Sequence, residues 1–231
     1  MKLKIFSFFL ASLAISTLPL STTASANLIQ NGDFSNDFNG FSSQYLRNDV
    51  SIFDEGTYTI GSNPAAVHPL FVNIAGGNPM LLANGAPGNN QVLLGYTGTV
   101  LAGGNYSFSA SVMNICCSQT FNGAPSTVLF QISQGGGPFA TIASYTTNPP
   151  GDAGVSNFVT SVTPFFLQTG LFSFRIIDTV NAAAGNDFAI DNLSIEAAAV
   201  PGPIVGAGFP GLLMALGGLV ALARRRRNLA V

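Results

Sequence analysis

Residues with the types and spacing needed for catalysis are few in this chain. His68 is the single histidine, and no G-x-S-x-G motif accompanies it. Asp54 and Glu55 are adjacent, so on a strand their carboxylates would face opposite sides, which favours a solvated turn over a paired-carboxylate site. No Walker, zinc or Rossmann pattern occurs in the sequence. We therefore expect a protein that is not an enzyme.

Cys116 and Cys117 are an unusual pair because they are adjacent. In an oxidising compartment free thiols tend to be oxidised. Adjacent Cα atoms across a trans peptide are about 3.8 Å apart, below the usual disulfide range of about 4.4 Å and more. Three arrangements stay open: a vicinal disulfide, intermolecular bridges, or one buried and one exposed thiol on opposite strand faces. None of them implies a redox function.

A sugar-binding site needs an exposed aromatic ring beside polar groups. The chain has five tyrosines and no tryptophan, and the alternation around Tyr106 assigns that ring to a core face. Tyr45 is followed by Arg47 and Asp49 in a polar segment and is the best exposed candidate. The alternative is that Tyr45 takes part in ordinary loop packing.

Charge is scarce and unevenly distributed. The chain of 231 residues is 47% hydrophobic and only 8% charged. Of its 8 basic residues, 2 lie before residue 27 and 4 after residue 223, so Arg47 and Arg175 are the only basic residues in between, against all 10 acidic residues. The body therefore carries 2 − 10 = −8 and no lysine. Such a surface is repelled by nucleic acid, so we expect no nucleic-acid partner.

Short alternating segments separated by Gly, Pro, Asn and Ser dominate residues 27–196. In 106–112 the apolar residues fall on one face and the serines on the other, and 172–176 repeats this pattern. Further strands are expected at 57–60, 91–96, 127–133, 139–144, 157–162 and 187–195. No segment of the body has a convincing helical period. The pattern predicts an all-β domain, an antiparallel β-sandwich.

The first 26 residues have the features of a secretory signal peptide. Lys2 and Lys4 precede an apolar stretch, and Ala24 and Ala26 form an A-x-A cleavage site, so the mature chain is expected to begin at Asn27. The alternative is an uncleaved N-terminal anchor.

The other end predicts a single transmembrane helix. Residues 204–223 contain no charge, and at about 1.5 Å per residue they would span roughly 30 Å, the thickness of a hydrocarbon core. Arg224, Arg225, Arg226 and Arg227 follow at once and would stop transfer, leaving residues 224–231 as a basic cytoplasmic tail. The alternative is a buried core helix. If residues 204–223 span the membrane, the body lies outside the inner membrane.

The C-terminal pattern resembles a known sorting signal. Val200, Pro201, Gly202 and Pro203, then the apolar span and the arginines, look like a PEP-CTERM signal, and residues 197–203 form its linker and motif. The resemblance implies cleavage by an exosortase, a membrane transpeptidase of Gram-negative bacteria that make exopolysaccharide. Gly202 departs from the commoner Glu of that motif. The implied route is an exported, membrane-anchored precursor that later reaches the periplasm, cell surface or extracellular matrix. A permanent anchor is the alternative.

Both ends of the body carry a second resemblance. Residues 27–34 and 188–195 look like the opening and closing strands of galactose-binding-like jelly rolls. The resemblance implies a structural calcium ion, with Asp191 as the closing-strand ligand and Asp33 or Asp187 as helpers, although Ser35 stands where the family has Glu. The uneven spacing of Ile190 and Leu193 independently predicts a bulge. The alternative for Asp191 is that it caps this bulge through backbone hydrogen bonds.

Three hypotheses of function follow. The first is an exported, surface-sorted, non-catalytic β-sandwich with a structural or adhesive role in extracellular matrix. The second is a carbohydrate-binding module for exopolysaccharide. The third is a glycoside hydrolase, which would need a cleft holding two carboxylates about 5–10 Å apart.

Overall fold

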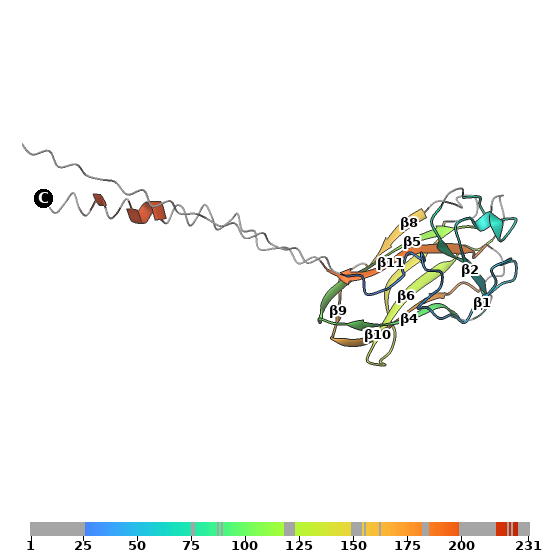
Figure 1. The fold of residues 1–231 in the computed structure, drawn as a ribbon, viewed down its shortest axis with the longest axis horizontal. Coiled ribbons are helices and arrows are strands. Elements are labelled where there is room, and N and C mark those ends of the chain that lie inside the picture. Colours follow the sequence, from blue (N-terminus) through green and yellow to red (C-terminus); the bar gives the residue numbers. More distant parts are fainter. Residues whose placement is uncertain are drawn as a thin grey trace, which may run out of the picture.

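Two β-sheets pack face to face in the folded domain (Figure 1). The computed structural model describes residues 26–74, 77–86, 88, 90–117, 123–148, 154, 156–161, 163–181, 185–198, 216–220, 222 and 224–225. The larger sheet has seven strands and the smaller has four. The predicted all-β sandwich is therefore confirmed for the described residues between 26 and 198.

The larger sheet has the strand order β1-β2-β3-β11-β5-β8, and β9 also pairs with β5. All of its pairings are antiparallel except β1 with β2, which is parallel. Its strands are β1 (Leu46–Arg47), β2 (Thr57–Gly61), β3 (Met80–Asn84), β5 (Gly104–Asn114), β8 (Ser156–Thr160), β9 (Phe165–Leu167) and β11 (Phe188–Ala197). A short 3-10 helix, η1 (Pro64–Ala66), lies between β2 and β3.

The smaller sheet has the order β4-β10-β6-β7 and is antiparallel throughout. Its strands are β4 (Val92–Val100), β6 (Thr127–Gln134), β7 (Ala140–Thr146) and β10 (Gly170–Asp178). Alternation places one face of each strand inward. Phe174 of β10 and Phe130 of β6 meet Phe108 of β5 across the sandwich, with ring centroids 5.6 Å and 4.7 Å from that of Phe108. These rings form the centre of the main core.

Eight predicted strands are found, within a few residues of their expected ends. The sequence pattern did not predict β3, because Leu81, Leu82 and Ala83 are all buried and a strand buried on both faces does not alternate. On its second face, Leu82 packs against Ile52 and Phe71 in a smaller core. β1 and β9 are too short to show a period.

The predicted bulge in β11 is present. The pairing of β11 with β5 shifts register between Asp191 and Ser194, and Asn192 has a positive φ of 54°. The extra residue returns both Ile190 and Leu193 to the core, where their exposures are 0% and 1%.

The opening segment is not the strand that the jelly-roll resemblance implied. Residues 28–33 form bends and turns instead. They nevertheless run beside β11, because the Leu28 amide donates to the Ile195 carbonyl (2.8 Å) and the Leu193 amide donates to the Gly32 carbonyl (2.9 Å). The two ends of the domain therefore lie side by side.

The terminal predictions fall largely outside the described residues. These include Ala24 and the signal peptide up to residue 25, the motif Val200, Pro201, Gly202 and Pro203, and the arginines Arg226 and Arg227. Of the predicted span, residues 216–220 and 222 are described as helical, as are Arg224 and Arg225. Within the described part of the chain, no helix has the length and apolar character needed to cross a bilayer. The signal, span and sorting motif stay predictions.

Candidate functional site

A groove of about 400 Å³ lies over the outer face of the smaller sheet. Register explains which side chains line its floor. Gly95 pairs with Arg175, and Thr97 pairs with Ser173, so these four residues of β4 and β10 share the outer face. Residues 40–42 form one wall, which is held to β4 by reciprocal backbone hydrogen bonds between Ser42 and Gly95 (2.7 Å and 2.9 Å). Phe139, just before β7, also lines the groove.

A hydrogen-bonded row of side chains crosses three of the four strands beside this groove. Arg175 pairs with Gln131, which pairs in turn with Thr141. The Arg175 Nε–H donates to Gln131 Oε1 (2.8 Å), and Gln131 Nε2 donates to the Thr141 hydroxyl (3.1 Å). The row fixes the orientation of the guanidinium, since its Nε–H is already bonded.

Phe139 gives the groove an aromatic ring. The Arg175 guanidinium carbon lies 3.9 Å from the ring centroid of Phe139, a cation–π contact. The Phe139 side chain is nonetheless 36% exposed. A planar cation and an aromatic ring are thus held together at the edge of an open groove.

The charge of Arg175 has no carboxylate partner among the described residues. Among the strands of the smaller sheet the only acidic residue is Asp178, which is 2% exposed at the end of β10. The other arginine of the body differs, because Arg47 forms ion pairs with Asp37 and Asp49, each at 2.8 Å. In a body of charge −8, the groove is therefore a local site of positive charge.

Tyr45 is not the exposed ring that we predicted. Its side chain is only 5% exposed, and its hydroxyl accepts a hydrogen bond from the Ala86 amide (3.1 Å). Burial raises the pKa of this phenol well above its ordinary value. Tyr45 packs into the main core, which corresponds to the packing alternative, and polar neighbours in the sequence concealed this role.

The three carboxylates proposed for calcium do not form one group, because Asp187 lies apart from Asp33 and Asp191. Asp191 Oδ1 accepts from the Asn192 amide (2.7 Å), as the capping alternative requires, and burial raises its pKa, with a smaller contribution from the negative charge of Asp33. Asp33 accepts from the amide and hydroxyl of Ser35 (3.2 Å and 2.9 Å), which lower its pKa. Among the described residues no group of three or more His, Cys, Asp or Glu is positioned to hold a metal ion. The calcium site stays a prediction, and no ligand set for it is visible in this part of the chain.

Asp187 belongs to a separate, buried acidic cluster. It is 5% exposed, and burial raises its pKa to about 7, with further contributions from the charges of Glu55 and Asp178. Burial also raises the pKa of Glu55 to about 7 and that of Asp178 to about 6. Among the described residues, Glu55 Oε2, Asn186 Oδ1 and Asp187 Oδ1 have no hydrogen-bond partner. The expectation of a solvated turn therefore holds for exposed Asp54 but is wrong for half-buried Glu55.

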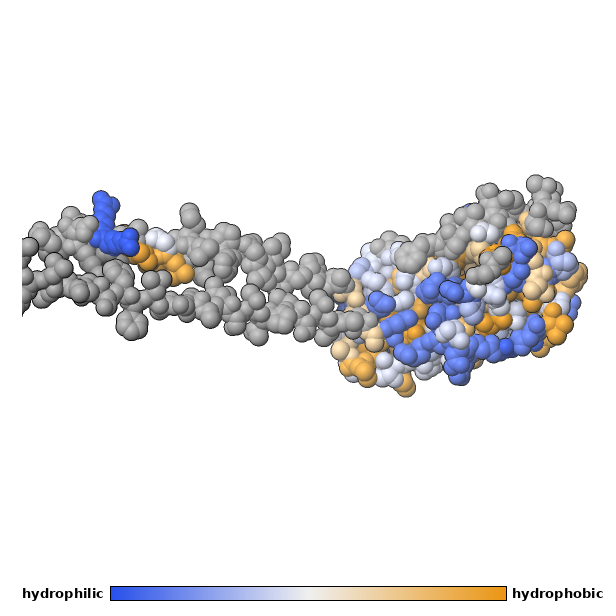
Figure 2. Space-filling view, turned by 45° about the horizontal axis from the view of Figure 1, so that its top comes forward, coloured by the Kyte–Doolittle hydropathy of each residue, from blue (hydrophilic) through white to orange (hydrophobic). Residues whose placement is uncertain are grey.

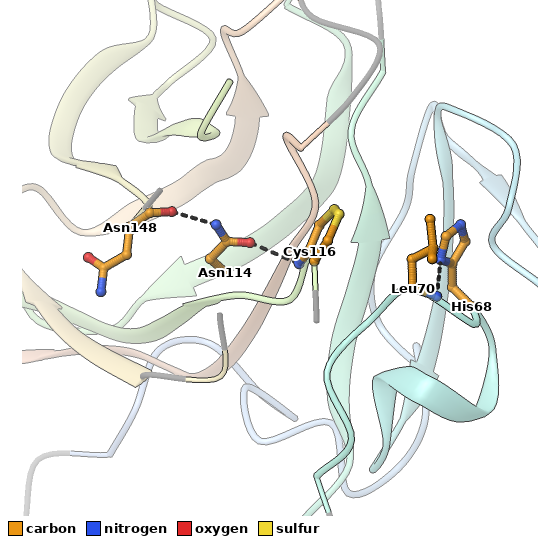
Figure 3. Close-up of a disulfide and its surroundings, with 6 residues drawn as sticks. His68, Leu70, Asn114, Cys116 and Asn148 are labelled. Atoms are coloured by element: carbon orange, nitrogen blue, oxygen red, sulfur yellow. Dashed lines mark hydrogen bonds between the residues drawn. A yellow bond between two sulfur atoms is a disulfide. The ribbon is translucent and has the colours of Figure 1, made fainter. Parts of the chain in front are cut away.

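Cys116 and Cys117 are joined by a disulfide bond, the first of the three predicted arrangements (Figure 3). Both residues are buried, with exposures of 4% and 5%. Asn114 orients them, since its side-chain oxygen accepts from the Cys116 amide (2.9 Å) and its Nδ2 donates to the Asn148 carbonyl. The pair belongs to the smaller core.

His68 has a packing role. Its ring stacks between Phe53 and Phe71, with centroid separations of 4.8 Å and 4.2 Å. Its Nδ1 accepts from the Leu70 amide (3.2 Å, Figure 3), and burial lowers its pKa, which keeps the ring neutral at pH 7.

The groove residues were only partly visible in the sequence. The alternation in 172–176 placed Arg175 on the polar face of its strand, and the charge count marked it as one of two body arginines. Phe139 was assigned to the start of a strand, which gave no indication of its exposure. Contact between Phe139 and Arg175 depends on the pairing order of β7, β6 and β10, which a single sequence does not reveal.

No protein-family model matches this chain, and no curated protein matches it either. Several solved structures resemble this chain at low sequence identity. The carbohydrate-binding module TmCBM61 in complex with β-1,4-galactotriose is 13% identical, with a TM-score of 0.43, and the match covers 75% of this chain and all of that one.

Two further structures show the same level of likeness. The K1 cleaved adhesin domain of Lys-gingipain from Porphyromonas gingivalis is 13% identical with a TM-score of 0.44, and the match covers 72% of this chain and 96% of that one. The tandem CBM22 domain of Paenibacillus barcinonensis Xyn10C is 13% identical with a TM-score of 0.45, and the match covers 79% of this chain and 52% of that one. At such values the likeness does not assign a ligand or a site to this chain.

Proposed function

We propose that the β-sandwich is a non-catalytic carbohydrate-binding module and that the groove over β4 and β10 is its binding site. The observation that carries the proposal is the exposed ring of Phe139 held against the fixed guanidinium of Arg175 at the groove. A sugar ring has an apolar C–H face and a rim of hydroxyls, so it requires an aromatic surface beside planar hydrogen-bonding groups.

The remaining groove residues suit the same ligand. Thr97, Ser173 and Ser42 supply hydroxyls, and the Arg175 guanidinium has five N–H donors, of which Gln131 occupies one. The described lining contains no acidic residue and no histidine, so the groove holds no pair of carboxylates for glycoside hydrolysis. The buried acids Asp178 and Asp187 lie in the interior, where a polysaccharide cannot reach them.

The predicted export and sorting signals fit a polysaccharide of the extracellular matrix as the ligand. A signal peptide, a PEP-CTERM-like motif and an exosortase would carry the module to the cell surface, where it would meet the exopolysaccharide that the resemblance implies. An adhesive role in the extracellular matrix then follows from binding itself.

Glycan-array screening followed by titration calorimetry on the full chain in detergent tests this proposal. Phe139→Ala and Arg175→Ala should each weaken the best polysaccharide ligand at least tenfold, about 1.4 kcal/mol, because each removes a groove contact without opening the core. Phe53→Ala is the matched control, since Phe53 is 61% exposed and does not line the groove.

Equal affinity of all three variants and wild type would place the sugar site elsewhere. Absence of binding to every glycan would refute carbohydrate recognition as a whole. Thermal melts of each variant establish that the sandwich is folded in both cases.

A further inference from the structure

We propose that one end of the sandwich inserts shallowly into the surface of a lipid bilayer through Leu101, Phe166 and Leu171, which we call the apolar tip. These side chains are 86%, 65% and 63% exposed. Large apolar side chains that are exposed at one end of a domain suit an apolar partner there. This surface is distinct from the proposed sugar groove, which none of the three residues lines.

Strand register brings the three residues to the same end of the domain. Leu101 follows directly after β4, whose last residue, Val100, pairs with Gly170, and Leu171 is the next residue of β10. Phe166 of β9 pairs with Asn105 of β5, only four positions after Leu101. The turn between β4 and β5 therefore lies between β9 and the start of β10.

Hydrogen bonds connect the turns at the tip to one another and to the neighbouring strand. The Gly103 amide donates to the Thr169 hydroxyl (3.1 Å), and the Tyr106 hydroxyl donates to the Ala102 carbonyl (2.7 Å). The Gln168 amide donates to Gln134 Oε1 (2.9 Å), which connects the tip to the end of β6. Because these backbone groups are bonded internally, they are not left unpaired when the turn enters an interface.

The turns at this end carry no charged side chain. Residues 101–105, 134–138 and 165–171 contain neither Asp, Glu, Lys nor Arg. A charged group at the tip would oppose insertion, whereas Gly, Gln, Thr and Asn are tolerated at headgroup depth.

The point where the chain leaves the domain identifies the bilayer as the partner. The Ala198 amide donates to the carbonyl of Asn105 (2.8 Å), so the chain departs from β11 beside the tip. Figure 1 shows the end of β11 at the same end of the domain as β9, and Figure 2 shows apolar surface there. Six Cα–Cα steps separate Ala198 from the predicted span at residue 204, a reach of at most about 20 Å.

That reach is shorter than the sandwich. The 11 residues of β5 extend for about 35 Å. In the precursor, with the predicted span in the membrane, the tip faces the lipid while the opposite end, near Phe53, is held away from it. Hydrophobic contact, and not electrostatic attraction, drives the insertion, since the negatively charged body is repelled by anionic lipid headgroups.

The absence of tryptophan makes a direct test available. The full chain with Phe166→Trp is reconstituted into phosphatidylcholine vesicles whose acyl chains carry bromine, and Phe53→Trp is the matched control, because Phe53 is similarly exposed (61%). We expect a blue-shifted, strongly quenched emission for Phe166→Trp and unquenched emission for Phe53→Trp. Adding Leu101→Ser and Leu171→Ser to Phe166→Trp should reduce the quenching at least twofold.

Equal quenching of the two tryptophans, or none for Phe166→Trp, would overturn the proposal. Failure of the chain to float with vesicles would also overturn it, because the predicted span is then not in the bilayer. A concentration-dependent blue shift without quenching would point to a second copy of the chain instead. If Phe166→Trp does not fold, Leu171→Trp provides the same readout. Sugar binding is measured separately, so its loss or retention does not affect this result.

Discussion

At the scale of single residues, contacts and burial set the roles of the charged groups. Arg47 and Arg175 are the two arginines of the body, yet Arg47 is neutralised by two aspartates while Arg175 bonds an amide and an aromatic ring. Asp187 differs from exposed acids because it is almost fully enclosed, near Glu55 and Asp178. A carboxylate in such surroundings is favoured in its protonated form.

The free energy of unfolding should therefore fall as pH rises. The pKa of Asp187 is about 7 in the folded protein against 3.8 ordinarily, so the folded state holds a proton that the unfolded chain releases between about pH 4 and 7. The stabilisation is full below pH 4 and is lost as pH rises through 7. Asp187→Asn removes the contribution of Asp187 to this dependence, leaving those of Glu55 and Asp178, and should raise stability at pH 8 by on the order of 2 kcal/mol.

Urea unfolding of wild type and Asp187→Asn at pH 5 and pH 8 measures this difference. Asp54→Asn is the control, since that side chain is exposed and should follow the wild-type curve. Parallel pH profiles for wild type and Asp187→Asn would show that Asp187 is not protonated in the fold.

At the scale of elements, β11 and the opening segment depend on each other. The Asn27 side chain accepts from the Ile195 amide (2.9 Å) and donates to the Leu193 carbonyl (2.8 Å), which satisfies backbone groups near the bulge. Gly32 lies so close that a Cβ there would be 2.0 Å from the Leu193 carbonyl oxygen. Only glycine allows this approach.

Gly32→Ala should consequently destabilise the domain by about 1–3 kcal/mol, because the added methyl forces the opening segment away from β11. Gly104→Ala is the matched control, since a Cβ at that position meets nothing within 4 Å. Thermal denaturation distinguishes the two, and an unchanged melting temperature for Gly32→Ala would mean that the segment is not packed as described.

Elements whose faces differ in polarity could be predicted from the sequence. β5 and β10 alternate Ser or Arg with apolar residues, so their inward faces were predicted correctly, and each predicted range ends two residues short of the strand on either side. The bulge followed from the odd spacing of Ile190 and Leu193. β3 could not be predicted, because a second core covers its other face and burial on both sides removes the alternation.

The candidate site was less accessible to sequence reasoning than the fold. Tyr45 was chosen for its polar neighbours, but those neighbours pair with one another and leave the ring in the core. Phe139 and Arg175 are 36 positions apart in sequence, so their contact is a product of strand order.

At the scale of the whole molecule, the sequence predicts a mature chain shorter than the translated one. The intact mass of protein isolated from cells should correspond to a start at Asn27 and to loss of the tail near Val200–Pro203. It should also be two hydrogen atoms lighter than the reduced form, because Cys116 and Cys117 are bonded. A mass equal to residues 1–231 would contradict both processing events, and a mass shift on reduction serves as the control for the disulfide.

The position of β11 has a mechanical consequence. This strand lies inside the larger sheet, with β3 along one side and β5 along the other, and the chain continues from its end. Tension transmitted through Ala198 would pull β11 along its own axis, at right angles to its interstrand hydrogen bonds. Those bonds would share the load simultaneously, in shear, whereas a strand pulled sideways releases them one after another. A domain tethered in this way would resist a pulling force better than one attached through a peripheral strand.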